Sequence, residues 1–234
     1  MTRLLVHVEG QSEEQFVNDL LAPYLLDFGY TAISARLIGN ARQRHRRGGM
    51  RSWISVRKDI TGHLKEDPGC IATTMVDYYA MPKTGSRAWP GRLQATHQGS
   101  SSEKGKIVED ALSENIANEM GPNFDRRRFI PFVAMHEFEA MLFSDCHKFA
   151  RGIGRPDLAS EFEEIRHQFA SPEEIDDSPD TAPSSRIRAL VPGYQKPLMG
   201  TFAASEIGLN AICAACPHFR RWLGQLERLA PEGQ

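Results

Sequence analysis

Residues 4–16 predict a strand, a tight turn and a helix, and they are Leu4-Leu5-Val6-His7-Val8-Glu9-Gly10-Gln11-Ser12-Glu13-Glu14-Gln15-Phe16. The run from Leu4 to Val8 is short and rich in Leu and Val, as in a buried strand, and Gly10 ends it. Ser12 is positioned to cap the following helix, with Gln15 completing a capping box. Glu9 is therefore expected at the carboxyl end of a strand, where open α/β sheets bind their ligands.

A second acid, Glu13, falls in the first turn of that helix, where the turn can bring its carboxylate back toward Glu9. Two carboxylates that face one cleft repel each other unless a proton or a cation lies between them. Carboxylate oxygens are hard ligands that suit Mg²⁺ or Mn²⁺, so Glu9 and Glu13 are candidate metal ligands. The alternative is that Glu13 and Glu14 are ordinary first-turn acids favoured by the helix dipole, and for Glu14 we prefer it.

The composition is that of a globular protein, with 234 residues of which 41% are hydrophobic and 25% are charged. No apolar run approaches the ~20 residues that cross a bilayer, and a strand begins too early for a signal peptide. Four cysteines at irregular spacing do not predict a disulfide scaffold, so we expect a cytoplasmic protein with no membrane association. The net charge of -2 does not by itself indicate nucleic-acid binding.

Asp77 repeats the position of Glu9 at the end of another apolar segment. Residues from Tyr30 to Ile38 predict a second strand, parallel to the first if the connection is a right-handed crossover. Ile71 to Val76 predicts a further buried strand, which Asp77 follows directly. Acids at the ends of neighbouring parallel strands converge, so Asp77 is a candidate ligand of the same metal. A strand-end Asp on its own is often only a turn former.

A basic stretch without acids lies between Arg36 and Lys58. Clustered guanidinium groups suit a phosphate backbone, and Trp53 offers a face on which a base can stack. The alternative is a solvated arginine-rich loop that leads into a helix from Ser52. We prefer an anion-binding role, and the candidate nucleic-acid contacts are Arg42, Arg44, Arg46, Arg47 and Arg51.

Further acids follow the apolar segment from Phe129 to Ala134, in which Pro131 indicates an edge strand or a bulge. Helical spacing would place His136 and Glu139 on one face, with Glu137 on another. Burying Glu139 without a partner would be costly, so a cation or a basic side chain should pair with it. Glu137 could be a simple helix-start acid, but we include it with Glu139 among the candidate metal ligands.

The rest of the chain predicts helices and one acidic loop. We expect helices over residues 106–120, 156–169, 201–215 and 217–229, and a solvated acidic loop over residues 171–180. Residues 99–106 superficially suggest a phosphate-binding loop, but the spacing is wrong and no strand precedes them. Cys213 and Cys216 could form a zinc site with Cys146, His147 and His218, although apolar packing at a helix end is the preferred interpretation.

Several motifs occur together in an order that resembles a known family. They are the Val8–Glu14 turn, the Val76–Tyr79 strand end and the His136–Leu142 segment, followed by Pro183–Ile187, Tyr194–Lys196 and Cys216–Phe219. Together they resemble a TOPRIM-like bacterial family of unknown function that is related to the overcoming-lysogenisation-defect (OLD) nucleases. The resemblance implies a compact, mainly parallel α/β fold with an acidic Mg²⁺ site. It also implies a relationship to nuclease effectors that work beside an ATPase in anti-phage defence.

The resemblance also implies roles for individual residues. The first strand-end Glu of the TOPRIM pattern is the catalytic acid or base, here Glu9, and the Glu four residues later, here Glu13, binds metal. The second motif of that pattern is normally Asp-x-Asp, whereas this chain has Asp77-Tyr78-Tyr79. A two-metal mechanism would therefore need a substitute acid, which is one of Glu137, Glu139 and Asp145.

We therefore expect an α/β, TOPRIM-like protein with a mainly parallel sheet over residues 1–150 and a helical C-terminal elaboration over residues 151–234 packed on that core. The leading function is hydrolysis of phosphodiester bonds in DNA or RNA that depends on Mg²⁺ or Mn²⁺. Glu9 and Lys196 are the candidate catalytic residues, with Lys196 near the phosphate backbone. The alternative is a non-catalytic subunit that binds an ATPase partner or nucleic acid. A primase-like or nucleotidyl-transfer activity and a homo-oligomer are left open.

Overall fold

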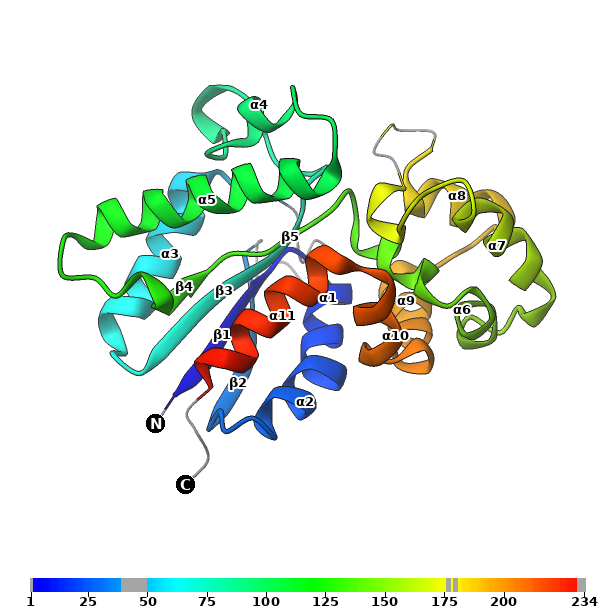
Figure 1. The fold of residues 1–234 in the computed structure, drawn as a ribbon, viewed down its shortest axis with the longest axis horizontal. Coiled ribbons are helices and arrows are strands. Elements are labelled where there is room, and N and C mark those ends of the chain that lie inside the picture. The colour runs from blue at the N-terminus through cyan, green and yellow to red at the C-terminus, as the bar shows by residue number, and fades with distance from the viewer. Residues whose placement is uncertain (1, 39–49, 176–177, 179–180, 231–234) are drawn as a thin grey trace.

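The computed structural model describes residues 2–38, 50–175, 178 and 181–230, which form a parallel sheet flanked by helices (Figure 1). Its strands are β1 (Arg3–Val8), β2 (Ala32–Leu37), β3 (Cys70–Asp77), β4 (Phe129–Ile130) and β5 (Val133–Ala134). Their order is β2-β1-β3-β4, with β5 also paired to β3, and each of these pairings is parallel. The predicted α/β class with a mostly parallel sheet is confirmed.

The helices lie between and beyond these strands. The first half of the chain contains α1 (Gln11–Phe16), the π-helical segment η1 (Val17–Leu21), α2 (Ala22–Leu26), α3 (Trp53–Glu66), the 3-10 turn η2 (Gly85–Arg87), α4 (Arg92–Ala95), α5 (Ser101–Met120) and the 3-10 turn η3 (Arg126–Arg128). The second half contains the 3-10 helix η4 (Phe138–Ser144), α6 (Cys146–Gly152), η5 (Pro156–Leu158), α7 (Ala159–Arg166), η6 (Pro172–Glu174), α8 (Pro183–Leu190), α9 (Lys196–Ile207), α10 (Leu209–Ala215) and α11 (Pro217–Leu229).

Two apolar cores lie on the two faces of the sheet. On one face, alternate residues of β1 (Leu4, Val6 and Val8) belong to the core that contains α1, α2 and α11. On the other face, Ala72 and Val76 of β3 belong to the core that contains α3 and α5. Figure 1 shows α11 running along the sheet beside α1 and α2, with α3 and α5 across the sheet from them. β1 is therefore a central strand covered by helices.

The C-terminal helices occupy two positions. Helices α6 to α10 gather beside the carboxyl ends of the strands, whereas α11 returns to the sheet (Figure 1). Trp222 Nε1 of α11 donates to Thr73 Oγ1 of β3 at 2.9 Å, and the Tyr30 hydroxyl donates to the Leu226 carbonyl at 2.8 Å. The predicted helical C-terminal region is present, and its last helix forms part of one face of the sheet. The domain boundary at residue 150 stays a prediction.

Among the described residues, no single helix has the length and apolar composition that crossing a membrane requires. Helices α9 and α10 meet that requirement only as a pair, and they are bent by 85° relative to each other. Both helices contribute buried residues to the core on the α11 side of the sheet, among them Ala203, Ile207 and Ile212.

The turn after β1 differs from the prediction in its capping residue. Helix α1 begins at Gln11, so Gly10 and not Ser12 is the N-cap, and Ser12 lies buried within the first turn. Glu13 Oε2 accepts a hydrogen bond from the Gly10 backbone N–H at 3.0 Å, which is the role predicted for Gln15. The helix therefore starts directly after the strand, and the carboxylate of Glu13 turns back toward the end of β1.

The segment around Pro131 contains two short strands in place of the single predicted one. β4 ends at Ile130 and β5 begins at Val133, so the chain leaves the ladder at Pro131 and Phe132. Proline cannot donate to a ladder, and β4 lies at the edge of the sheet, as Pro131 indicated. The helix predicted from residue 106 instead begins at Ser101, because Ser100 caps it by accepting the Glu103 backbone N–H at 3.3 Å.

Candidate active site

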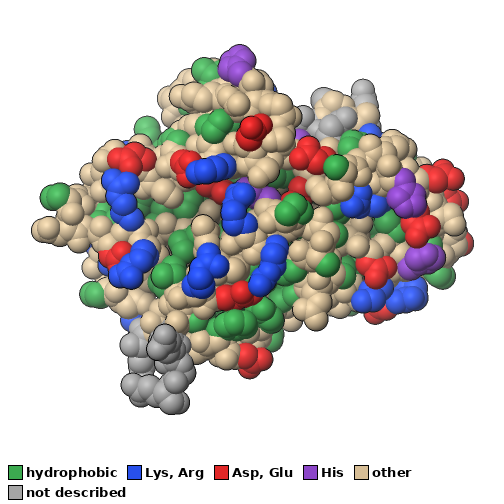
Figure 2. Space-filling model, viewed as in Figure 1, with side chains coloured by type: hydrophobic (Ala, Val, Ile, Leu, Met, Phe, Trp, Pro, Cys, Tyr) green, Lys and Arg blue, Asp and Glu red, His purple; other side chains and the backbone are tan. Residues whose placement is uncertain are grey.

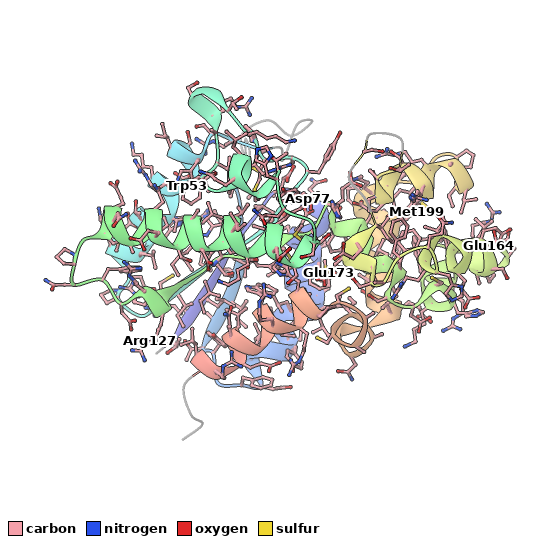
Figure 3. All side chains as sticks on the ribbon, turned by 45° about the horizontal axis from the view of Figure 1, so that its top comes forward. Trp53, Asp77, Arg127, Glu164, Glu173 and Met199 are labelled. Atoms are coloured by element: carbon pink, nitrogen blue, oxygen red, sulfur yellow. The ribbon has the colours of Figure 1, made fainter. Side chains whose placement is uncertain are left out.

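The two strand-end acids, Glu9 and Asp77, lie next to each other. β1 and β3 are neighbouring parallel strands, so the residues that follow them meet at the same edge of the sheet. The Asp77 backbone N–H points at Glu9 Oε2, at 3.4 Å. Figure 3 shows Asp77 at the end of the sheet nearest the C-terminal helices. The convergence expected for acids on neighbouring strands is observed.

Glu13 joins them from the first turn of α1. Its side chain is buried, with 6% of the residue exposed, and its carboxylate is fixed by the Gly10 N–H. A Cβ atom at position 10 would come within 3.2 Å of Glu13 Oε2, which is closer than most carbon–oxygen contacts. A glycine at this position therefore allows the carboxylate to approach the strand end.

The turn before η4 brings two more acids to the same place. His136 has a backbone φ of 64°, a left-handed conformation that is uncommon for residues other than glycine. Its carbonyl accepts the Tyr79 N–H at 3.1 Å, and Asp77 Oδ1 accepts the Phe138 N–H at 2.9 Å. These bonds fasten the turn to the end of β3, so that Glu137 and Glu139 lie beside the strand-end acids.

The predicted helical phasing of His136 with Glu139 is wrong, because η4 begins only at Phe138 and His136 before it has a left-handed backbone conformation. The His136 ring instead contacts the start of α5, with Nε2 at 3.2 Å from Ser101 Oγ. Ser101 Oγ also donates to Glu174 Oε2 at 2.9 Å. His136 therefore connects the turn to α5 and η6.

Lys196, the first residue of α9, provides the basic partner expected for Glu139. Its Nζ lies 3.0 Å from Glu139 Oε2 and 3.5 Å from Glu137 Oε1. Glu137 also accepts from Ser184 at the start of α8, through the backbone N–H at 2.9 Å and the hydroxyl at 3.1 Å. Only 2% of Glu139 is exposed, so the ion pair with Lys196 compensates a carboxylate that has lost its water.

Burial and mutual repulsion raise the pKa values of these acids. Burial raises the pKa of Glu9 to about 7, and the charges of Glu137 and Glu139 act in the same direction. Burial together with the charges of Glu9 and Glu139 raises the pKa of Glu13 to about 7. Burial, then the charge of Glu9, holds the pKa of Asp77 well above its usual range. These three carboxylates carry more negative charge than their surroundings neutralise, so each favours a proton or a nearby cation.

Lys196 keeps its charge in this setting. Burial alone lowers the pKa of a lysine, but the carboxylates of Glu139, Glu137 and Asp77 outweigh that effect and raise the pKa of Lys196 above its ordinary value. For Glu139, burial raises the pKa and Lys196 opposes the rise. The cluster therefore divides into two parts: Glu137 and Glu139 share the ammonium group, while Glu9, Glu13 and Asp77 face each other.

The donor chemistry of the acid cluster fits a hard divalent cation, because each side chain offers carboxylate oxygens. In the part of the chain that the structure describes, however, no three His, Cys, Asp or Glu side chains are already arranged as metal ligands. The residues that would hold such an ion by position and charge are Glu9, Glu13 and Asp77, with Glu139 beside them.

Other predicted site residues lie elsewhere. Arg42, Arg44, Arg46 and Arg47 lie outside the described residues. Arg51 NH1 pairs with Asp59 at 3.1 Å at the start of α3. Asp145, a possible substitute acid in the sequence, caps α6 by accepting the Lys148 N–H at 2.9 Å. The alternative zinc site is not assembled among the described residues, where Cys216 is buried with its Sγ 3.4 Å from Ser144 Oγ.

The acidic loop is only partly the solvated segment that its composition predicted. Glu173 is buried and accepts the backbone N–H groups of His218 and Phe219, each at 2.9 Å, so it caps the start of α11. Glu174 binds Ser101 at the start of α5. Figure 3 shows Glu173 beside the first turn of α11. These acids were misjudged because their partners are distant in sequence.

A groove with both basic and acidic side chains could not be found from the sequence, because its residues are scattered along the chain. It is a groove of about 370 Å³ between α5 and α11, and its lining includes Lys106, Glu109, Ser113, Arg221 and Gln225. Figure 2 shows Lys and Arg side chains gathered along this part of the surface. Acids accompany them: Lys106 pairs with Asp110, and Arg221 NH2 lies 3.5 Å from Glu109 Oε2. The groove is therefore mixed in charge.

Fold and site together define an α/β protein with an acid cluster at the carboxyl end of a parallel sheet. The chain belongs to a family described as a domain of unknown function (DUF4276), whose model matches residues 8–227. The comparisons with curated proteins and with solved structures gave no match. The family match includes every member of the acid cluster and Lys196.

Proposed function

We propose that this protein is a divalent-metal-dependent phosphodiesterase that cleaves DNA or RNA. The observation that carries the proposal is the meeting of Glu9, Glu13 and Asp77 at one edge of the sheet, with Glu139 and Lys196 beside them. Buried acids with raised pKa values are unfavourable in a purely structural role, and they are common where a protein holds protons or cations for catalysis.

Within this proposal, each residue has a definite task. Glu9, whose pKa is raised to about 7 by burial, takes or returns the proton of the attacking water. Glu13 and Asp77, together with Glu9 and Glu139, would hold Mg²⁺ or Mn²⁺, which when bound neutralises phosphate charge and lowers the pKa of a water molecule. Lys196 remains protonated and attracts the phosphodiester to the acid cluster.

The proposal extends to the relationship implied by the motifs. We infer a TOPRIM-like site in which Glu9 and Asp77 take the positions of the two strand-end acids, in a chain related to OLD-type nucleases and to effectors of anti-phage defence. The second acid of the usual Asp-x-Asp motif is Tyr79 here. Glu139 is better placed than Asp145 to compensate for it, because Asp145 is engaged as a helix cap.

A second candidate function is a non-catalytic subunit that binds an ATPase partner or nucleic acid. One observation favours it: Lys196 already pairs with Glu137 and Glu139 within the chain. An ion pair made within the chain can hold these two acids without a metal ion, and acids held in this way can serve only to shape a binding surface.

Measuring the cleavage activity of the Glu9→Gln variant distinguishes the two candidate functions. The substitution keeps the size of the side chain and removes its proton chemistry, so we expect cleavage to fall by at least about 100-fold while nucleic-acid binding is retained. Single-stranded DNA, duplex DNA and structured RNA should each be offered with Mg²⁺ and with Mn²⁺, in the presence and absence of an ATPase partner.

Glu14→Gln is the matched control, because Glu14 lies beside Glu13 in α1 and is half-buried, yet it makes no side-chain bond to the acid cluster. We expect this variant to cleave as the unmodified protein does. If neither the unmodified protein nor Glu9→Gln cleaves any substrate of the panel, the phosphodiesterase proposal is contradicted and the non-catalytic subunit is favoured.

A further inference from the structure

Tyr194 carries a buried hydroxyl that has no hydrogen-bond partner among the described residues. Only 7% of the residue is exposed. A buried hydroxyl without a partner loses its hydrogen bonds to water and gains nothing in return, which is unfavourable by roughly 1–3 kcal/mol. Such a group indicates either a water molecule or a ligand that completes it.

The hydroxyl lies against the segments that build the acid cluster. A Cβ atom at Gly200 would lie 3.1 Å from the Tyr194 hydroxyl and 3.8 Å from the ring of Phe138, so these three residues are neighbours. Phe138 stands between Glu137 and Glu139, and Gly200 lies one turn after Lys196 on α9. The charges of Glu139 and Glu137 also reach the Tyr194 hydroxyl, adding to burial in raising its pKa.

Lys196, one turn before Gly200 on α9, has a donor to spare. An ammonium group has three N–H donors, and the described acceptors of Lys196 are the carboxylates of Glu139 and Glu137. The Lys196 side chain is 32% exposed, so its remaining donor can be reached from solvent.

We propose that the Tyr194 hydroxyl and the Lys196 ammonium form an oxyanion-binding position that holds a phosphoryl group beside the acid cluster. Two unused donors call for a ligand that accepts on more than one oxygen, and a phosphoryl group does so. A metal ion does not fit this position, because Lys196 is itself a cation. The inference rests on the proposed function and specifies which side of the cluster receives the phosphate.

Binding of inorganic phosphate tests the position without requiring cleavage. Tyr194→Phe removes only the hydroxyl, so we expect the affinity for phosphate to fall about tenfold, the effect of losing one good hydrogen bond. The midpoint of thermal unfolding without phosphate should stay unchanged or rise, because the hydroxyl has no protein partner to lose. Both quantities can be measured by calorimetry on the full chain.

Tyr30→Phe is the matched control. The Tyr30 hydroxyl is also buried, but it donates to the Leu226 carbonyl at 2.8 Å, on the far side of the core. We expect Tyr30→Phe to lower the unfolding midpoint and to leave phosphate affinity unchanged, the opposite of the result expected for Tyr194→Phe.

Phosphate affinity and stability together decide the inference. An unmodified protein that does not bind millimolar phosphate, or a Tyr194→Phe variant with unchanged affinity, would overturn it. A Tyr194→Phe variant that loses stability as Tyr30→Phe does, with phosphate affinity intact, would show that a water molecule completes the hydroxyl, and this also overturns it. Phosphate affinity that falls as expected supports the inference even if no nucleic acid is cleaved, so failure of the nuclease proposal remains distinguishable.

Discussion

Glu9 and Glu13 show how a single side chain acquires chemistry from its position. Both are ordinary glutamates, but the strand end and the first turn of α1 place them out of water and close to other carboxylates, so their pKa values rise to about 7. His7 of β1 lies two residues before Glu9, and burial shifts its pKa in the opposite direction. Burial and the neighbouring His63 lower the pKa of His7 to about 3.

The raised pKa values predict how stability depends on pH in the absence of divalent metal. The folded protein keeps protons on Glu9 and Glu13 up to about pH 7, whereas an unfolded glutamate loses its proton near pH 4.5. The stabilising contribution of these acids to the free energy of unfolding is therefore fully present below pH 4.5, and it is lost as the pH rises through about 7. We expect Glu9→Gln to gain on the order of 1–3 kcal/mol over the unmodified protein between pH 5 and pH 8.

Chemical denaturation at a series of pH values measures this difference. The quantity to follow is the difference in free energy of unfolding between the variant and the unmodified protein. The total stability of both proteins falls at acid pH, because the pKa of His7 is lowered in the folded state. A difference that does not change with pH would mean that Glu9 titrates normally in the folded protein.

Among the elements, the strands and most helices could be predicted, because their signals are local. The apolar runs that became β1 and β3 are periodic and short, and α11 was predicted with its observed bounds, since Pro217 marks its first turn. The strand-end acids followed from the same reasoning, because parallel neighbours bring their carboxyl ends together.

The elements that escaped prediction depend on contacts between distant residues. The left-handed turn at His136 and the cap that Glu173 provides for α11 have no local signature. Ser184 and Tyr194 are likewise ordinary loop and helix residues until α8 and α9 fold over Glu137. Sequence spacing could not show that Lys196, which is 57 positions from Glu139, would lie 3.0 Å from it.

The cap on α11 gives a prediction at this scale. Glu173→Ala leaves the His218 and Phe219 N–H groups buried without their acceptor, so we expect the free energy of unfolding to fall by about 1–3 kcal/mol. Glu164→Ala is the control, because Glu164 is an exposed acid of α7 (Figure 3) and should change stability very little. Equal stability of the two variants, measured by urea unfolding, would show that the cap contributes nothing.

At the scale of the whole molecule, the acid cluster couples ligand binding to folding. Its members come from the end of β1, from α1, from β3 and from the start of η4, with Lys196 from α9, so the cluster exists only when all these segments are folded together. A ligand that needs several of these side chains binds the folded protein and not the unfolded chain.

A divalent cation should therefore stabilise the entire molecule. At about 100 times its dissociation constant, Mg²⁺ or Mn²⁺ should raise the free energy of unfolding by about 2.7 kcal/mol. The double variant Glu9→Gln with Asp77→Asn should lose this gain, and Glu14→Gln should keep it. Thermal unfolding with and without millimolar metal makes the measurement, and a gain that survives in the double variant would place the ion elsewhere.

The return of α11 to the sheet has a consequence for biosynthesis. Tyr24 and Tyr30 bond to Glu227 and Leu226, across 203 and 196 positions of the chain. A ribosome adds roughly 5–20 residues per second, so the first strands are made well before the helix that covers them. The part of the apolar sheet face that α11 covers then stays exposed until α11 has been made, and contacts across such long separations form slowly. We therefore expect the nascent chain to expose apolar sheet surface until α11 has been synthesised, and to bind chaperones during that time.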